Sequence, residues 1–269
     1  MQKELSTGYI PTVGLGTYQL QGNNCESAVK AALNQGYEHI DTAEIYDNQA
    51  CIGKALSQTN RDKLFVTSKI WRSHFSYEAV LTSTDRTLRE LQTDYLDLLL
   101  LHWPKRGADY ESLFRALKKL VDAGTVRNIG VSNFTIDHLR DVLPVADRVG
   151  VDIAVNQVEF HPYLYQEDLL AFCEEHDVQL EGYAPIAKGD VVGDEELSRI
   201  GQRYGKSAVQ VALRWAIQHG VVVIPRSSSE DHIRSNIDVF NFELSDEEMK
   251  RVNNLHRGRR LYDPPFAEF

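Results

Sequence analysis

Three polar residues that each close an apolar run constrain this chain more than any other feature. Asp41, Lys69 and His102 follow such runs at spacings of 28 residues (41 to 69) and 33 residues (69 to 102). One strand, one helix and two loops need about this length, which is the repeat of an α/β barrel. The carboxyl ends of barrel strands surround one mouth. We therefore expect these side chains to converge there, together with Tyr46, which follows Asp41 by five residues.

Apolar runs alternate with helical patterns along the whole sequence, which predicts parallel strands buried on both faces. The fold class is therefore predicted to be α/β, a (β/α)₈ TIM barrel in one domain spanning residues 1–269, with an open doubly wound sheet as the alternative. The expected helices lie at about 24–35, 47–58, 76–91, 110–123, 136–143, 166–176, 194–219 and 229–237. The expected strands are Val13–Leu15, Glu38–Ile40, Leu64–Thr67, Leu96–Leu101, Asn128–Val131, Ala154–Gln157, Gln179–Glu181 and Val221–Ile224.

Two additions to the barrel are expected at its ends. Leu5–Thr12 is predicted to form a short N-terminal hairpin or plug over the barrel bottom. Ser245, followed by Glu248 three residues later, is a capping-box pattern that predicts a C-terminal helix to about Leu255. The tail to residue 269 is expected to be irregular because Pro264 and Pro265 block a helix, and to reach over a mouth of the barrel.

Composition excludes several classes of partner. The formal charge of −10 argues against a nucleic-acid surface and an anionic membrane surface. The three cysteines form no C-x-x-C pair, and no apolar stretch has the length of a signal peptide or of a membrane span. We expect a reduced, cytoplasmic protein without a metal site.

The four polar residues suit proton transfer to a carbonyl group. A free phenol has a pKa of about 10, and an adjacent ammonium lowers it. Lys69 can be that ammonium, and Asp41 can hold Lys69 by a charge-assisted hydrogen bond. Tyr46 is then expected to protonate the carbonyl oxygen while His102 orients it. Taken singly, these residues have plainer interpretations as a helix cap, a surface charge and a buried core residue.

Several longer motifs give the chain a family resemblance over nearly its whole length. It resembles the aldo-keto reductase superfamily, and most of all its small prokaryotic 2,5-diketo-D-gluconate and methylglyoxal reductases. The segments that carry the resemblance are Gly14-Leu15-Gly16-Thr17-Tyr18, Gly36-Tyr37-Glu38-His39-Ile40-Asp41-Thr42-Ala43 with Ile45-Tyr46-Asp47-Asn48, Ile129-Gly130-Val131-Ser132-Asn133-Phe134, and Asn156-Gln157-Val158-Glu159 with His161-Pro162.

The resemblance implies reduction of small aldehydes or ketones by NADPH without a Rossmann fold, and the chain has no G-x-G-x-x-G that follows a strand and opens a helix. It also implies a catalytic tetrad, with Tyr46 as proton donor, that consists of Asp41, Tyr46, Lys69 and His102. The cofactor contacts that it implies near the nicotinamide are Gly16, Thr17, Asp41, Ser132, Asn133, Gln157 and Tyr183. Tyr183 would stack on the nicotinamide ring, although core packing is the alternative for this residue.

The phosphate end of the cofactor is expected where the last predicted strand enters a helix. Arg226 and Ser227 stand there, and a helix N-terminus with a guanidinium binds anions. An ordinary Ser cap beside a surface Arg is the alternative. By the resemblance, Asn236 contacts the adenine, Arg226 replaces the usual Lys, and His232 replaces the usual Arg. Arg226 keeps the positive charge, whereas His232 loses one and Arg234 points elsewhere on the helix and cannot replace it. We therefore expect NADPH to be preferred, with weaker discrimination against NADH than a Lys/Arg pair would give.

Aromatic residues are the candidates for the substrate wall. Tyr18, Trp71 and Trp103, with the tail around Tyr262–Phe266, suit a small or flat carbonyl compound, such as a 2-oxoaldehyde or a diketo sugar acid. The short connection Trp103–Asp109 predicts an open mouth. We expect a monomer whose only partner is this small molecule.

Two rival functions stay open at this point. One is an NADPH-binding sensing or regulatory subunit with little turnover, which an intact tetrad disfavours. The other is a metal-dependent barrel hydrolase, which needs several His, Asp or Glu ligands at strand ends. Only Asp41 and His102 stand at such positions.

Overall fold

The computed structural model describes residues 2–5 and 7–269 and contains the predicted barrel. Its eight strands are all parallel and lie in chain order. Between the first and last strands, the Gly14 N–H donates to the Val223 carbonyl (2.8 Å) and the Val223 N–H to the Thr12 carbonyl (2.9 Å), which brings the sheet round to a barrel. The strands are β3 (Leu15–Gly16), β4 (His39–Asp41), β5 (Phe65–Ile70), β6 (Leu96–Leu101), β7 (Val126–Ser132), β8 (Ile153–Glu159), β9 (Gln179–Tyr183) and β10 (Val222–Ile224).

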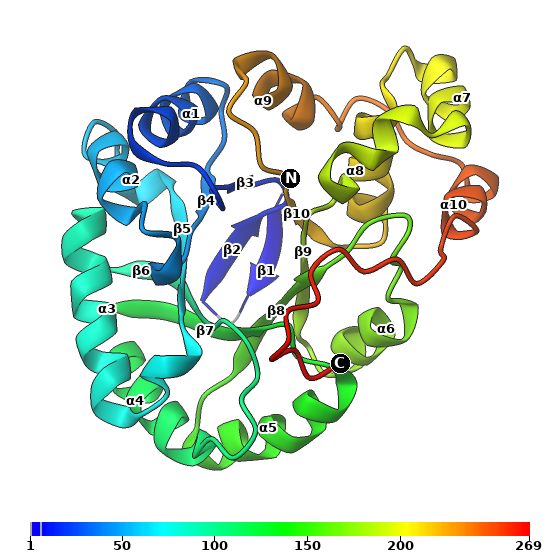
Figure 1. Cartoon of the computed structure of the whole chain (residues 1–269). Coiled ribbons are helices and arrows are strands. Elements are labelled where there is room, and N and C mark those ends of the chain that lie inside the picture. The colour runs from blue at the N-terminus through cyan, green and yellow to red at the C-terminus, as the bar shows by residue number, and fades with distance from the viewer. Residues whose placement is uncertain (1, 6) are drawn as a thin grey trace.

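A ring of helices surrounds the strands (Figure 1). The single helix predicted over 194–219 is wrong, because the chain breaks there into two helices. Gly205 has a left-handed φ of 65°, and Ser207 begins the second helix with a capping box to Gln210. The helices are α1 (Gly22–Asn34), α2 (Gln49–Leu56), α3 (Tyr77–Leu91), α4 (Tyr110–Asp122), α5 (Ile136–Val149), α6 (Glu167–Glu175), α7 (Glu195–Tyr204), α8 (Ala208–Gln218), α9 (Glu230–Ile237) and α10 (Asp246–Asn253).

The N-terminal hairpin closes the bottom of the barrel, as the sequence predicted. Strand β1 (Gln2–Leu5) pairs antiparallel with β2 (Gly8–Pro11), so the hairpin begins three residues earlier than expected. It is visible through the centre of the ring in Figure 1. Leu5 packs on a buried apolar group that includes Phe65, where β5 begins. Ser6, within the predicted hairpin, lies outside the described residues.

The C-terminal tail crosses the opposite end of the barrel. The capping box at Ser245 is present, and α10 follows it. Beyond α10, Phe266 lies edge-on to Trp71 and to Trp103, with ring centroids 5.5 Å apart in both pairs. The connection after His102 is short, as predicted, and the tail contacts these two indoles, so it reaches over a mouth of the barrel as the sequence predicted.

The barrel interior contains several fully buried polar side chains. His39, Thr67, Lys69 and Glu181 are each 0% exposed although they carry polar or ionisable groups. A buried polar group is costly unless it is hydrogen-bonded. These buried groups must therefore be held by specific partners, which are described below for the mouth of the barrel.

Candidate active site

The four tetrad candidates come together at the mouth of the barrel. Lys69, on β5, is fully buried, and its Nζ donates to Asp41 Oδ1 at 2.6 Å and to the Thr42 carbonyl at 2.8 Å. The same Nζ lies 3.5 Å from the Tyr46 hydroxyl. His102 directly follows β6, and its ring lies edge-on to that of Tyr46, with centroids 5.6 Å apart. The geometry thus links a carboxylate, an ammonium and a phenol in series beside an imidazole.

Tyr46 is placed by a short turn, Glu44–Tyr46, that follows β4. Glu44 anchors this turn with a nearly buried carboxylate that accepts hydrogen bonds from the Trp71 N–H and from Arg86, the latter at 2.8 Å. His74 Nδ1 lies 2.9 Å from the same carboxylate. Glu44 therefore ties the turn that carries Tyr46 to Trp71 and to Arg86 on α3. Sequence reasoning missed it because nothing in its local pattern distinguishes it from a surface carboxylate.

The expected lowering of the Tyr46 pKa by Lys69 is wrong for this structure. Burial raises the pKa of Tyr46 well above its usual value, and the Asp41 carboxylate raises it further. The ammonium does not outweigh these effects. Tyr46 is therefore a neutral phenol at neutral pH.

His102 is a neutral imidazole in this setting. Burial lowers its pKa well below the usual range, and the Lys69 ammonium lowers it further. Its Nδ1 has no hydrogen-bond partner within residues 2–5 and 7–269. This buried ring nitrogen is therefore an unsatisfied polar atom beside the cavity.

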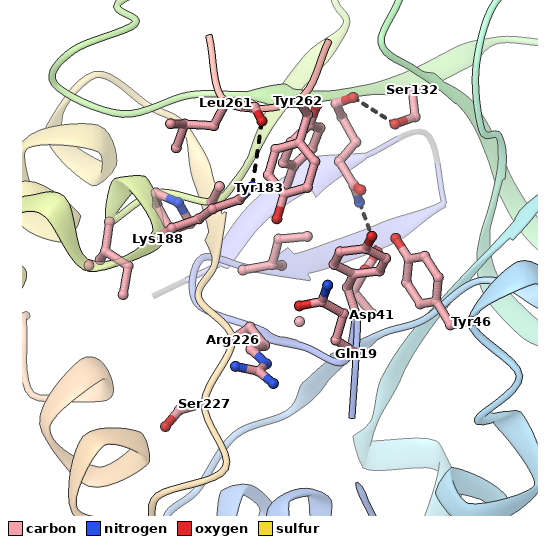
Figure 2. A pocket seen from close by; sticks show the side chains of 18 of the residues that line it. Gln19, Asp41, Tyr46, Ser132, Tyr183, Lys188, Arg226, Ser227, Leu261 and Tyr262 are labelled. Atoms are coloured by element: carbon pink, nitrogen blue, oxygen red, sulfur yellow. Dashed lines mark hydrogen bonds between the residues drawn. The ribbon is translucent and has the colours of Figure 1, made fainter. Parts of the chain in front are cut away.

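A cavity of about 1120 Å³ opens over the tetrad. Figure 2 shows Asp41 and Tyr46 on one side of it and Arg226 and Ser227 on another. Thr17 and Lys69 do not line this cavity: both are fully buried, and the Thr17 hydroxyl donates to the Asp41 carbonyl at 2.8 Å. The other predicted site residues all line it, namely Gly16, Tyr18, Asp41, Tyr46, Trp71, His102, Trp103, Ser132, Asn133, Gln157, Tyr183, Arg226, Ser227 and Asn236.

The residues expected around a nicotinamide hold one another in place. Asn133 Nδ2 donates to the His102 carbonyl at 3.0 Å, and the Tyr183 hydroxyl donates to Asn133 Oδ1 at 2.8 Å. The Ser132 hydroxyl donates to the Gln157 carbonyl at 2.8 Å. Four strand ends are thereby fixed relative to each other, with polar edges that face the cavity.

The phosphate end is built differently. Arg226 is exposed and forms no ion pair within the described part of the chain. The Ser229 N–H donates to the Ser227 hydroxyl at 3.1 Å, just before α9. His232 lines the cavity, whereas Arg234 does not and pairs with Asp231 at 2.6 Å, as its helix position predicted. An unpaired guanidinium beside a helix N-terminus fits the phosphate end of a dinucleotide phosphate.

The loop after β9 also lines the cavity and was not predicted. Ala184, Lys188 and Gly189 contribute to it. Non-glycine residues Ala184 (φ 49°), Ala187 (φ 47°) and Lys188 (φ 55°) have left-handed backbone there, a conformation that favours Gly or Asn. Alanine carries no sequence signal for such a loop. Lys188 lies over the Tyr262 ring at 3.9 Å and so connects this loop with the tail.

Comparison with known proteins agrees with this geometry. Residues 12–257 match the model of the Aldo/keto reductase family. This chain belongs to the aldo/keto reductase family. It is therefore an NAD(P)H-dependent oxidoreductase that reduces carbonyl groups, which removes the metal hydrolase and disfavours a sensing subunit. In the described residues, no group of three or more His, Cys, Asp and Glu side chains is placed to hold a metal ion, and no helix could span a membrane.

Three relatives illustrate the similarity. The chain is 42% identical to glyoxal reductase from Bacillus subtilis (strain 168), over 95% of this chain and 92% of that protein. It is 40% identical to methylglyoxal reductase DkgA from Yersinia pestis, over 95% and 92% of the two chains. A solved structure described as a putative 2,5-diketo-D-gluconic acid reductase B superposes with a TM-score of 0.94, 37% identity, and coverage of 100% of this chain and 97% of that chain.

Proposed function

We propose that this protein uses NADPH to reduce small aldehydes and ketones, with Tyr46 as the proton donor. The observation that carries the proposal is the series Asp41–Lys69–Tyr46, joined at 2.6 Å and 3.5 Å, at the base of a cavity lined by His102. Lys69 is fully buried there, and burying an ion pair costs desolvation free energy. A role in the chemistry explains why a charged pair occupies this position.

In the proposed reaction, the carbonyl carbon would receive a hydride that NADPH bound in this cavity would supply. His102 orients the substrate by donating a hydrogen bond to the carbonyl oxygen from its neutral ring. Tyr46 gives its proton to that oxygen as negative charge develops on it. Lys69 stabilises the resulting phenolate, and Asp41 holds Lys69 in position. The raised pKa of Tyr46 suits this sequence, because the proton leaves only when the oxygen has become strongly basic.

The residues around the cavity also favour a choice of cofactor. Arg226 is a permanent cation that forms no ion pair with the residues the structure describes, and Ser227 adds a hydroxyl beside it, which suits the additional phosphate of NADPH. His232 carries no permanent charge on the same side. We therefore propose NADPH over NADH, with modest discrimination.

Small 2-oxoaldehydes are the substrates proposed first. Tyr18, Trp71, Trp103 and Phe266 line the cavity, and the aromatic part of the wall that they form suits small or flat compounds. The named relatives include a glyoxal reductase and a methylglyoxal reductase, which supports this choice. The similarity to a putative 2,5-diketo-D-gluconic acid reductase makes diketo sugar acids the second class that we propose.

The proposal is tested by following NADPH oxidation with glyoxal, methylglyoxal, a nitrobenzaldehyde and a diketo sugar acid, each repeated with NADH. We expect turnover of at least one 2-oxoaldehyde, with a higher kcat/KM for NADPH. Failure of every carbonyl in a protein that still binds NADPH would contradict the proposed activity. A kcat/KM ratio of one or below would contradict the cofactor preference.

A further inference from the structure

Three buried groups stand in a row at the base of the cavity, where Asp41 and Gln157 line it and Glu181 does not. Gln157 lies between two carboxyl groups, and its Nε2 is 2.8 Å from Asp41 Oδ2 and 2.8 Å from Glu181 Oε2. Gln157 and Asp41 are each 2% exposed and Glu181 is 0% exposed. The nitrogen of a primary amide carries two hydrogens. Both are used here, one by each carboxyl group.

This arrangement fixes which way the amide of Gln157 faces. Turned over, the amide would set Oε1 against Asp41 and Glu181, and Asp41 can only accept because it is ion-paired with Lys69. Oε1 is therefore directed away from both carboxyl groups. It makes no hydrogen bond with the described residues, and Gln157 lines the cavity.

The neighbouring polar groups are already engaged. Asn133 Nδ2 donates to the His102 carbonyl at 3.0 Å and to the Ser132 hydroxyl at 3.1 Å. Asn133 Oδ1 accepts from Tyr183, and the Ser132 hydroxyl donates to the Gln157 carbonyl. Among the amide and hydroxyl groups of Ser132, Asn133 and Gln157, the Gln157 Oε1 atom is the acceptor without a partner in the described part of the chain.

Packing alone does not explain why a carboxylic acid occupies the buried position of Glu181. Its Oε1 makes no hydrogen bond within residues 2–5 and 7–269, and His39 Nε2 is 3.6 Å away. Burial, and next the Asp41 carboxylate, raise the pKa of Glu181 to about 8, while Gln157 and Lys69 oppose this rise. A well-packed apolar residue would stabilise this position more than a half-satisfied carboxyl group does. What the carboxyl group contributes is the second acceptor for Gln157.

We propose that Glu181 is a positioning residue that, with Asp41, locks the Gln157 amide so that its carbonyl oxygen accepts a hydrogen bond from the carboxamide NH₂ of the nicotinamide. Glu181 does not line the cavity and acts only through Gln157. The inference rests on the proposed use of a nicotinamide cofactor and assigns the orientation of its carboxamide to a residue outside the binding surface.

Binding of two dinucleotides tests this directly. NADP⁺ has the carboxamide, and its 3-acetylpyridine analogue has a methyl group in place of the NH₂. Both would be titrated by fluorescence quenching into the wild type, Glu181→Met and Glu181→Gln. Methionine removes the acceptor at similar length, whereas glutamine keeps an oxygen for Gln157 and is the matched control.

We expect the wild type and Glu181→Gln to bind NADP⁺ about tenfold more tightly than the analogue, the effect of one well-placed hydrogen bond. In Glu181→Met this preference should fall to about twofold or less, through weaker NADP⁺ binding and unchanged analogue binding. Rescue by glutamine separates the positioning role from a general loss of packing.

An unchanged preference in folded Glu181→Met would overturn the inference. If that variant does not fold, Glu181→Leu takes its place: a preference that falls to about twofold or less supports the inference, and a retained tenfold preference overturns it. Binding of neither dinucleotide by the wild type would instead contradict the proposed cofactor, and the inference would fall with it.

Discussion

The two ends of the cavity are built on opposite principles. At the end that we assign to the nicotinamide, Lys69 is fully buried. Its Nζ donates to Asp41 at 2.6 Å and to the Thr42 carbonyl at 2.8 Å, and Gln157 donates to Asp41 at 2.8 Å. At the phosphate end, Arg226 is exposed and unpaired within the described residues, and His232 is exposed beside it.

The buried end holds its side chains in fixed positions, whereas the exposed end can accept substitutions with small effects. Charges in a buried network interact strongly and fix the position of the Tyr46 hydroxyl. Charges at the surface are screened by water and salt, so each contributes little. We therefore expect substitutions at the buried end to abolish chemistry, and substitutions at the exposed end to adjust cofactor choice by small factors.

The largest effect is expected for Lys69→Met, which removes the centre of the buried network. Asp41 is left as a buried carboxylate without its cation, which costs about 3–5 kcal/mol of stability. Tyr46 loses the stabilising charge for its phenolate, so kcat should fall by about 10³-fold. Urea denaturation and steady-state rates measure the two effects.

The double variant Asp41→Asn/Lys69→Met is the control for this prediction. Without either charge, the desolvation cost of the pair disappears, so much of the lost stability should return. Activity should stay low, because nothing supports the phenolate. Wild-type stability in Lys69→Met would contradict the view that this end is electrostatically locked.

A smaller effect, on stability alone, is expected from pH. The pKa of Glu181 is raised from 4.5 to about 8, so the native state holds a proton that the unfolded state has released between these values. Stability from this group is fully present below pH 4.5 and is lost as pH rises towards about 8, by up to about 1.4 kcal/mol per pH unit.

His39 acts in the opposite direction, but only at lower pH. Its pKa is lowered from 6.5 to about 3 by burial, so its contribution rises with pH across that window and is constant above it. Between pH 6.5 and 8 the free energy of unfolding should therefore decline in the wild type and stay flatter in Glu181→Gln. Parallel curves for the two proteins, from urea denaturation, would contradict this assignment.

The smallest effect is expected for His232→Arg at the exposed end. A second permanent cation on the cavity side of α9 should raise the ratio of kcat/KM for NADPH over NADH by about two- to fivefold, the range of a solvent-exposed ion pair. Arg234→His is the matched control, because Arg234 is paired with Asp231 outside the cavity and should leave the ratio unchanged. A change of a hundredfold would show that this end is as tightly built as the other.

The same contrast explains what could be predicted from the sequence. The strands were predictable because runs such as Leu98–Leu101 are apolar on both faces, and their spacing placed Asp41, Lys69 and His102 at one mouth. The break between α7 and α8 was also encoded, in Gly205 and in the capping box of Ser207, but the long apolar pattern obscured it.

Other features depend on contacts that no local pattern records. The pKa of Tyr46 is raised by burial and by Asp41, Tyr183, Tyr18 and Tyr262, so the outcome depends on segments distant in the sequence. The left-handed backbone at Ala184 and Ala187 is imposed by the packed loop and not by residue type. The bridge from Asp41 through Gln157 to Glu181 likewise appears only when three strands are seen together.

Tyr46→Phe tests the central claim most directly, because it removes one oxygen atom from the buried end and leaves the exposed end intact. NADPH binding and methylglyoxal reduction would be measured on the same samples. The account predicts that kcat falls by about 10³-fold while NADPH affinity changes by less than about twofold. Retention of most of the reductase activity would show that the proton comes from another group and would contradict the account.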